Sequence, residues 1–155
     1  MRRIRRVECQ NVRGLTVSPP TCSRMFRGLR IKVIEMIECL VVGLGGFLGA
    51  VMRYLVGLVP VGAQGGFPYK TLAINVVGAF AIGVVVAFAA RGVVSPRWEL
   101  FLKVGICGGF TTFSTFALEC DQLAARGSAG QAVLYVCLSL SLGMLAAFLG
   151  QRVAG

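Results

Sequence analysis

Four long apolar segments, separated by short links, constrain this chain more than any other feature of its sequence. The second segment has twenty residues without a charge. As a helix rising ~1.5 Å per residue, it is long enough to cross the ~30 Å hydrocarbon layer of a membrane. Only 14% of all residues are charged, against about 25% in soluble domains. The sequence predicts an all-α membrane protein whose four transmembrane helices lie near residues 36–60, 71–90, 98–120 and 127–151.

Residues 1–35 form a separate, basic extension without a sustained apolar run. They hold nine of the 16 Lys and Arg residues, so the net charge of +10 belongs mainly to this stretch. A charge confined to a tail argues against nucleic acid as a partner of the folded body. We expect the extension to be disordered or to result from a mis-assigned start codon, because Met36 directly precedes the first apolar segment. The transmembrane domain is then expected over residues 36–155.

Four short helices make a thin bundle that cannot enclose a wide pore alone, which predicts an oligomer. The spacing Gly45-x-x-x-Gly49 offers a close-packing face for such an assembly, although many apolar helices contain it by chance. Outside the extension, Lys and Arg are distributed almost evenly between the two sets of loops, so the orientation preference is weak. A chain with a weak preference can insert both ways, which would allow an antiparallel dimer of one gene product.

The residue types in the sequence do not favour an enzyme. The chain has no histidine, and none of its six cysteines forms a C-x-x-C pair, so a zinc site or a Ser-His or Cys-His pair is not expected. We therefore expect no enzyme. The carboxylates of the body, Glu38, Glu99, Glu119 and Asp121, fall near segment ends. This placement argues against a proton-coupled exporter, which normally needs an acid inside the membrane.

The third segment contains GGFTTFSTF over residues 108–116, in which two glycines precede a run of hydroxyl residues. Such residues are poor helix formers, so the third helix is expected to break here. A break within a membrane frees backbone carbonyls that can coordinate a small cation, and amides that can meet an anion. A regular helix with closely packed Gly and Thr remains the alternative.

Three side chains in the second and third segments are candidates for contact with an anion. Phe113 and Phe116 share a helix face, and aromatic rings have positive edges. Lipid-facing bulk is the alternative for this pair. The amide of Asn75 could donate a hydrogen bond to an anion or could equally join two helices.

The fourth segment carries a polar stripe with a spacing of four residues, which places its members on one helix face. These groups can donate hydrogen bonds without a fixed charge, which suits an anion that must shed water and leave again. Helix–helix packing is the alternative. The stripe comprises Gln131, Tyr135, Ser139 and Gly143. Arg53, the deepest basic residue, either draws anions toward a pore mouth or extends to the membrane interface.

Three motifs in this order resemble those of the Fluc (CrcB) fluoride channels: GGFLGAVMRY at 45–54, TLAINVVG at 71–78 and GGFTTFSTF at 108–116. The resemblance covers roughly residues 40–150. It implies an antiparallel dual-topology dimer with two fluoride pores, a broken third helix, and a structural sodium ion at the dimer interface. The backbone carbonyls of Gly108 and Thr111 from both subunits would hold this ion. The implied fluoride path comprises Asn75, Thr112, Phe113, Ser114, Phe116, Tyr135 and Ser139, with Arg53 at the pore mouth. Gly143 departs from the pattern where some members carry a hydroxyl.

From this resemblance we expect a passive, fluoride-selective channel that exports fluoride across the cytoplasmic membrane and protects against fluoride toxicity. Its partners would be fluoride, sodium, membrane lipid and a second copy of the chain. The alternative is a small dual-topology multidrug or cation exporter.

Overall fold

The computed structural model describes residues 19–60 and 66–155, with the backbone alone for residues 19–33. The chain divides into two compact units, Met1–Ile37 and Glu38–Gly155. The description of packing below concerns the second unit, which contains nearly all of the four apolar segments. Within the described residues, every regular element is helical.

Four stretches of helix in the described part are long and apolar enough to cross a membrane. The first is Ile34–Leu58, the C-terminal part of α1 (Pro19–Leu58). The second is α2 (Tyr69–Ala90) and the fourth is α6 (Ala129–Ala154). The third, Pro96–Ala125, is composite: α3 (Pro96–Glu99), the π-helix η1 (Leu100–Cys107), α4 (Gly108–Phe110) and α5 (Phe113–Ala125). The four predicted segments are confirmed, with ends that differ by a few residues.

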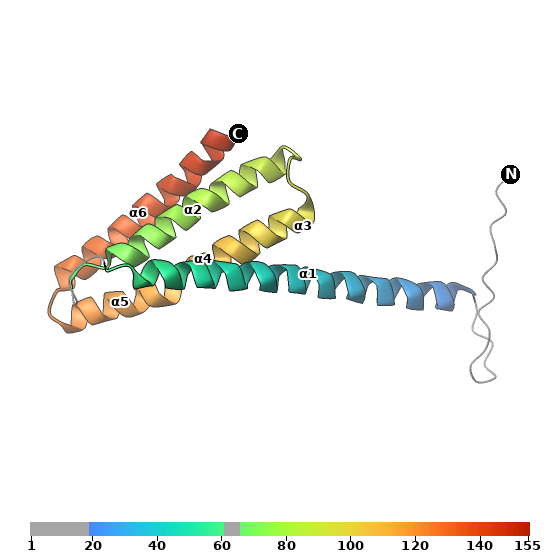
Figure 1. Cartoon of the computed structure of the whole chain (residues 1–155), viewed down its shortest axis with the longest axis horizontal. Helices are drawn as coiled ribbons and strands as arrows, with labels where there is room; N and C mark the ends of the chain where they lie inside the picture. The colour runs from blue at the N-terminus through green and yellow to red at the C-terminus, as the bar shows by residue number, and fades with distance from the viewer. Residues whose placement is uncertain (1–18, 61–65) are drawn as a thin grey trace. The chain divides into compact units, whose positions relative to one another are not determined.

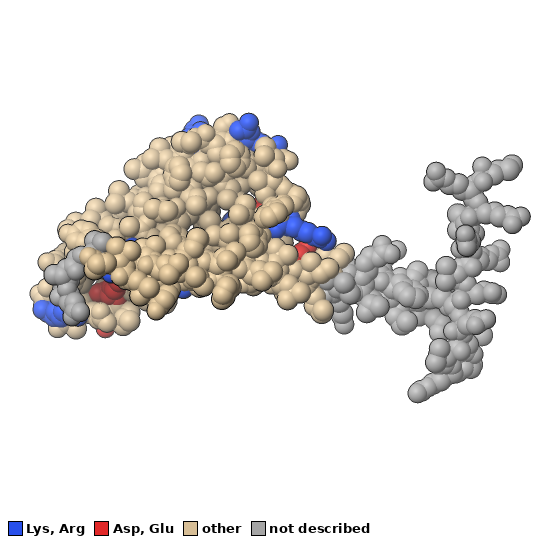
Figure 2. All heavy atoms as spheres, in the orientation of Figure 1, with Lys and Arg blue, Asp and Glu red and all other residues tan. Residues whose placement is uncertain are grey.

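The surface of the second unit is broadly apolar. Leu40, Phe47 and Met144 are exposed by 67%, 66% and 75%, and many other large apolar side chains are exposed with them. Figure 2 shows that, on the face in view, the charged atoms gather toward the ends of the helices and leave a wide uncharged surface between them. A surface of this extent requires lipid or another protein chain, because water does not tolerate so large an apolar area.

Glycine allows α2 and α6 to pack along their lengths, where they lie side by side (Figure 1). A Cβ atom at Gly83 would collide with the carbonyl oxygen of Ala147, and one at Gly150 would collide with that of Phe80. The two helices therefore meet backbone to backbone at both points, as small residues permit in membranes.

The same kind of contact joins α1 to the third span, which corrects the expected use of the Gly45-x-x-x-Gly49 motif. A Cβ atom at Gly45 would lie 2.5 Å from the carbonyl oxygen of Phe101. A Cβ atom at Gly49 would lie 2.7 Å from the amide nitrogen of Phe110 and collide with the Ile106 oxygen. The motif packs within one chain, so it is not available as a face for a second copy.

Helices α2 and α5 end in the same way. Gly92 and Gly127 have φ of 71° and 76°, in the left-handed region that favours glycine. Each glycine, with the residue after it, donates its amide hydrogen to a carbonyl of the last helical turn, as in Gly92 N to Ala89 O at 3.0 Å. The helices α2 and α5 therefore end at these glycines, and a short link leads from each to the next span.

Residues 19–35 of the basic extension belong to helix α1. The rest of it, residues 1–18, lies outside the described residues. The junction that the sequence suggested at Met36 falls inside a continuous helix.

The contact at Gly49 predicts a loss of stability when this glycine is replaced. In Gly49→Ala the new methyl group meets the backbone of the third span, and overpacking of this kind costs about 1–3 kcal/mol. Thermal unfolding in detergent should show a lower melting temperature. Gly43→Ala is the control on the same helix, because nothing lies within 4 Å of its new Cβ atom. Equal melting temperatures for the two variants would contradict the packing described.

Candidate functional site

The third span is interrupted at two residues between α4 and α5. Thr111 and Thr112 both have extended backbone, with φ and ψ of −74° and 156° and of −146° and 114°. Thr111 closes α4, because its amide donates to the Cys107 oxygen at 3.0 Å. Thr112 opens α5 as its N-cap, because its hydroxyl accepts from the amide of Thr115 at 3.2 Å. The expected break therefore lies within the hydroxyl run.

Asn75 of α2 holds this interruption in place. Its Oδ1 accepts the Thr112 amide hydrogen at 2.8 Å, and its Nδ2 donates to the Thr112 carbonyl oxygen at 3.1 Å. Gly78, one turn further along α2, makes room for Thr111, since a Cβ atom there would collide with the Thr111 methyl group. Of the two roles considered for Asn75, helix joining is the one this geometry displays. The amide group has two hydrogens, so one N–H is not used by the contact to Thr112.

The two hydrogen bonds of Asn75 change which backbone carbonyls near the break accept a hydrogen bond. In a continuous helix the Thr112 amide would donate to Gly108, and the Thr115 amide would donate to Thr111. Here these two amides donate to the side chains of Asn75 and Thr112 instead. The carbonyl oxygens of Gly108 and Thr111 are thus released by the break, whereas that of Gly109 accepts from Arg53 Nε at 3.1 Å.

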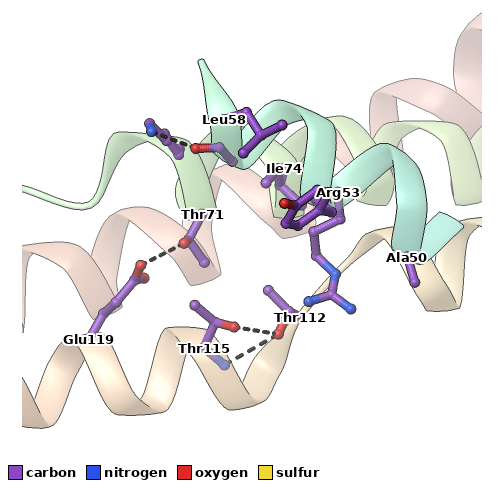
Figure 3. Close-up of a pocket in the computed structure, with 11 residues that line it drawn as sticks. Ala50, Arg53, Leu58, Thr71, Ile74, Thr112, Thr115 and Glu119 are labelled. Atoms are coloured by element: carbon purple, nitrogen blue, oxygen red, sulfur yellow. Dashed lines mark hydrogen bonds between the residues drawn. The ribbon is translucent and has the colours of Figure 1, made fainter. Parts of the chain in front are cut away.

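A cavity of about 560 Å³ opens beside the break, between α1, α2 and α5. Its polar lining includes Arg53, Lys70, Thr71, Thr112, Thr115 and Glu119. In Figure 3 the guanidinium group of Arg53 reaches toward Thr112. Lys70 Nζ donates to the carbonyl oxygen of Gly57 at 2.9 Å, near the end of α1. Two cations and one carboxylate line the cavity, so an anion that enters meets an excess of positive charge.

Glu119 of α5 lies beside the cavity and makes two hydrogen bonds to other helices. It is six residues before the end of α5 at Ala125, or about 9 Å along the helix. Its Oε1 accepts the Thr71 hydroxyl at 2.7 Å, and its Oε2 accepts the Tyr135 hydroxyl at 2.8 Å. The bond to Thr71 is drawn in Figure 3. Glu119 therefore lies near the end of the third span, as predicted, and it is bonded to hydroxyl groups of two other helices.

Tyr135, which bonds to this carboxylate, belongs to a series of neighbouring aromatic rings. Tyr135 is fully buried in α6, and its ring centroid lies 5.0 Å from that of Phe116. Phe116 lies 5.8 Å from Phe113, whose side chain is 79% exposed. Phe67 stands edge-on to Tyr135 at 5.5 Å. The hydroxyl proton of Tyr135 is engaged by Glu119, so this tyrosine is held in place rather than left free to donate to an ion.

Ser139 lies one turn beyond Tyr135 on α6. Its Oγ is buried and, among the described residues, is the one buried side-chain polar atom without a hydrogen-bond partner. A buried hydroxyl group normally has a partner, so the Ser139 hydroxyl can still bond to a further group. The outer members of the predicted stripe differ in burial: Gln131 is exposed and Gly143 is half-buried.

The structure thus brings together most of the predicted residues, in two neighbouring sets. Arg53, Asn75 and Thr112 meet around the break, with Ser114 Oγ 3.3 Å from the Thr112 hydroxyl. Phe113, Phe116 and Tyr135 form the second set. The exposed side chains of Phe113 and Ser114 are not enclosed by this chain.

Several residues that line the cavity had not been predicted as site residues from the sequence: Lys70, Thr71, Thr115 and Glu119. A weak signal existed for two of them. Thr71 begins the second motif, and Glu119 is the first charge after a long uncharged stretch. Sequence spacing alone could not show that these two residues meet across two helices.

Comparisons with known proteins all point to one protein family. Residues 40–151 match the family described as CrcB-like protein, Camphor Resistance (CrcB). A protein of Thermus thermophilus named fluoride-specific ion channel FluC is 45% identical over 121 residues, which covers 77% of this chain and 97% of that protein. A protein of the same name from Agrobacterium fabrum is 44% identical over 74% of this chain and 94% of its own length. Another, from Chlorobaculum tepidum, is 44% identical over 77% and 95%.

The hydrogen bonds of Asn75 to Thr112 predict that removing the Asn75 side chain lowers the stability of the fold. Asn75→Ala leaves the amide and carbonyl groups of Thr112 without this partner, which should destabilise the fold by about 1–3 kcal/mol. A lower melting temperature in detergent is expected. Val77→Ala, at a side chain 57% exposed on the same helix, serves as the control and should change the melting temperature little. A melting temperature unchanged by Asn75→Ala would rule out this role.

Proposed function

Because the chain belongs to the CrcB-like protein family, we propose that it is a fluoride-selective ion channel. Relatives named fluoride-specific ion channel align over nearly their whole length, and the four helical spans make the chain a multi-pass membrane protein. It is not an enzyme. Its family is one of ion channels. The observation that carries the proposal is the unpaired, buried hydroxyl group of Ser139, one turn from the aromatic series.

Fluoride holds its water tightly, so a channel for it must offer replacement hydrogen-bond donors within the membrane. The Ser139 hydroxyl, the unused N–H of Asn75 and the positive ring edges of Phe113 and Phe116 are such groups. None of them carries a full charge. Donors of this kind can replace water around a small anion without binding it too tightly to leave.

The cavity beside the break would serve as the entrance to this path. Its cations, Arg53 and Lys70, raise the local concentration of anions. Both are anchored through hydrogen bonds to backbone carbonyls, so their charges stay at the rim. Thr71 and Tyr135 are held by Glu119, which fixes the wall between the cavity and the aromatic series.

The direction of transport follows from electrostatics. In an acidic medium fluoride enters cells as neutral HF, which ionises in the less acidic cytoplasm. An open anion path in the cytoplasmic membrane lets fluoride leave, with ~2.3 kcal/mol of driving force per charge for each 100 mV of membrane potential. The protein would thereby protect the cell against fluoride. A small multidrug or cation exporter, the alternative, is not favoured by the relatives.

We further propose that two copies of the chain assemble in opposite orientations and share a structural sodium ion. The carbonyl oxygens of Gly108 and Thr111 lose their helical donors at the break, and hard oxygen ligands of this kind suit sodium. Two carbonyls from one chain are too few for a complete shell, so a second copy would supply the rest.

Fluoride efflux from liposomes tests the function directly. Purified protein in vesicles loaded with potassium fluoride should release fluoride to an electrode when valinomycin removes the opposing voltage, without any proton gradient. Chloride-loaded vesicles should release far less. Release no faster than from protein-free vesicles would end the proposal, and release that requires a proton gradient would support the exporter.

Ser139→Ala tests the observation that carries the proposal. Loss of one hydrogen bond to an anion, worth about 1.5 kcal/mol, should slow fluoride flux about tenfold. Ser141→Ala is the matched control, because Ser141 is an exposed serine two residues further along the same helix. Equal fluxes for the two variants would exclude Ser139 from the path.

The dimer and its sodium ion can be tested together in detergent. Light scattering should give twice the chain mass of 16.4 kDa. The melting temperature should be higher in sodium chloride than in choline chloride of equal ionic strength, because an ion that binds only the folded state stabilises it. A monomer, or identical melting temperatures in the two salts, would contradict this part of the proposal.

A further inference from the structure

A second cavity, of about 180 Å³, lies between α1 and the start of the third span. It is lined by Val41 of α1 and by Arg97, Trp98 and Phe101 of the third span. One turn further along α1, a Cβ atom at Gly45 would lie only 2.5 Å from the Phe101 carbonyl oxygen, so the two helices touch directly there. At Val41 this glycine contact has ended, and space remains between the helices.

The wall of this cavity is entirely apolar. Arg97 therefore contributes its hydrocarbon stem, while its guanidinium group lies outside the cavity. Apolar cavities of similar size stay dry in proteins and can take up a small hydrocarbon. Because this cavity is open to its surroundings, a hydrocarbon chain of the membrane suits it better than water does.

The cavity lies just inside one edge of the membrane span. The third span begins at Pro96, so Arg97 and Trp98 are among its first residues, and Phe101 follows about 8 Å further along the helix. Trp98 is 60% exposed and stands edge-on to Phe101, with the ring centroids 5.6 Å apart. Exposed tryptophan and arginine at the end of a span are typical of the level of the lipid headgroups. The apolar cavity then lies at the level of the acyl chains beneath them.

The charged groups near the cavity suit a headgroup that carries both signs of charge. Glu99 is paired with Lys103, whereas no carboxylate in the part of the chain that the structure describes forms an ion pair with Arg97. The guanidinium group of Arg97 can therefore bind a phosphate group. Glu38 precedes Val41 by three residues in α1, so both lie on one helix face, with Glu38 nearer the membrane surface. Its carboxylate can accept hydrogen bonds from an ammonium group.

We propose that this cavity binds one acyl chain of a phosphatidylethanolamine molecule, whose phosphate group binds Arg97 and whose ammonium group binds Glu38. A choline headgroup has no N–H to donate to the carboxylate. None of the residues in this lipid site belongs to the proposed fluoride path, so the inference goes beyond conduction and does not depend on it. In an antiparallel pair each copy would hold one such lipid, and the two lipids would lie in opposite leaflets.

Trp98 is the single tryptophan of the chain, so its fluorescence reports on this site. The full-length protein is reconstituted in vesicles with equal amounts of phosphatidylethanolamine and phosphatidylcholine. Bromine, which quenches tryptophan on contact, is carried on the acyl chains of one lipid or of the other. Brominated phosphatidylethanolamine should quench Trp98 more strongly, with an apparent preference of about fivefold. Equal quenching by the two lipids would overturn the proposal, and so would a Trp98 that neither lipid quenches because a second copy covers it.

Charge variants test the two headgroup contacts. Glu38→Gln removes the acceptor for the ammonium group, and Arg97→Gln removes the group that holds the phosphate and thereby places the ammonium group. Each variant should abolish most of the preference for phosphatidylethanolamine in the same vesicles. A preference that survives either substitution would contradict the proposed contacts.

Arg152→Gln is the matched control for the loss of a positive charge. Arg91 Nη1 donates to the carbonyl oxygen of Ala154 at 2.7 Å, so the end of α6 lies at the same end of the body as the link before the third span. The guanidinium group of Arg152 lies 5.0 Å from the ring centroid of Phe148, on a different helix from the cavity. This variant should keep the preference of the unmodified chain, and its loss would show that general surface charge attracts the lipid and would refute the site.

Discussion

The pair of hydrogen bonds between Asn75 and the backbone of Thr112 is the interaction on which the rest of the site depends. A helix within lipid cannot break unless its backbone groups find new partners. One side chain from α2 provides a partner for both groups of Thr112, so the third span can be interrupted without leaving that residue unsatisfied. The same substitution of partners releases the carbonyls of Gly108 and Thr111.

The charged side chains of Arg53 and Glu119, which line the cavity beside the break, are hydrogen-bonded within the chain. Arg53 donates one hydrogen bond to the Gly109 carbonyl oxygen, and Glu119 accepts hydrogen bonds from two hydroxyl groups. These hydrogen bonds lower the free-energy cost of placing the charged groups in the membrane and hold their side chains in the cavity lining. These two charged groups thus bond within the chain, whereas the residues of the proposed path are uncharged donors.

The sequence was sufficient for the spans and for the site of the break, because both depend on local composition. It could not decide between the two roles of Asn75, since an amide can bond to an anion or to backbone with equal ease. It placed Glu119 near the end of a segment but could not show that this carboxylate bonds to Thr71 and Tyr135 of two other helices. The Gly45-x-x-x-Gly49 motif was recognised as a packing face, but spacing does not say which chain packs on it.

The direct backbone contacts between α1 and the third span have an evolutionary consequence. Gly45 touches Gly105, and Gly109 touches Gly46, so the room for a larger side chain on one helix depends on the residue facing it. A substitution on one side alone would force the two helices apart and displace the break that Asn75 holds. Sequence drift at this seam must therefore proceed in correlated steps, with small residues retained or exchanged in facing pairs.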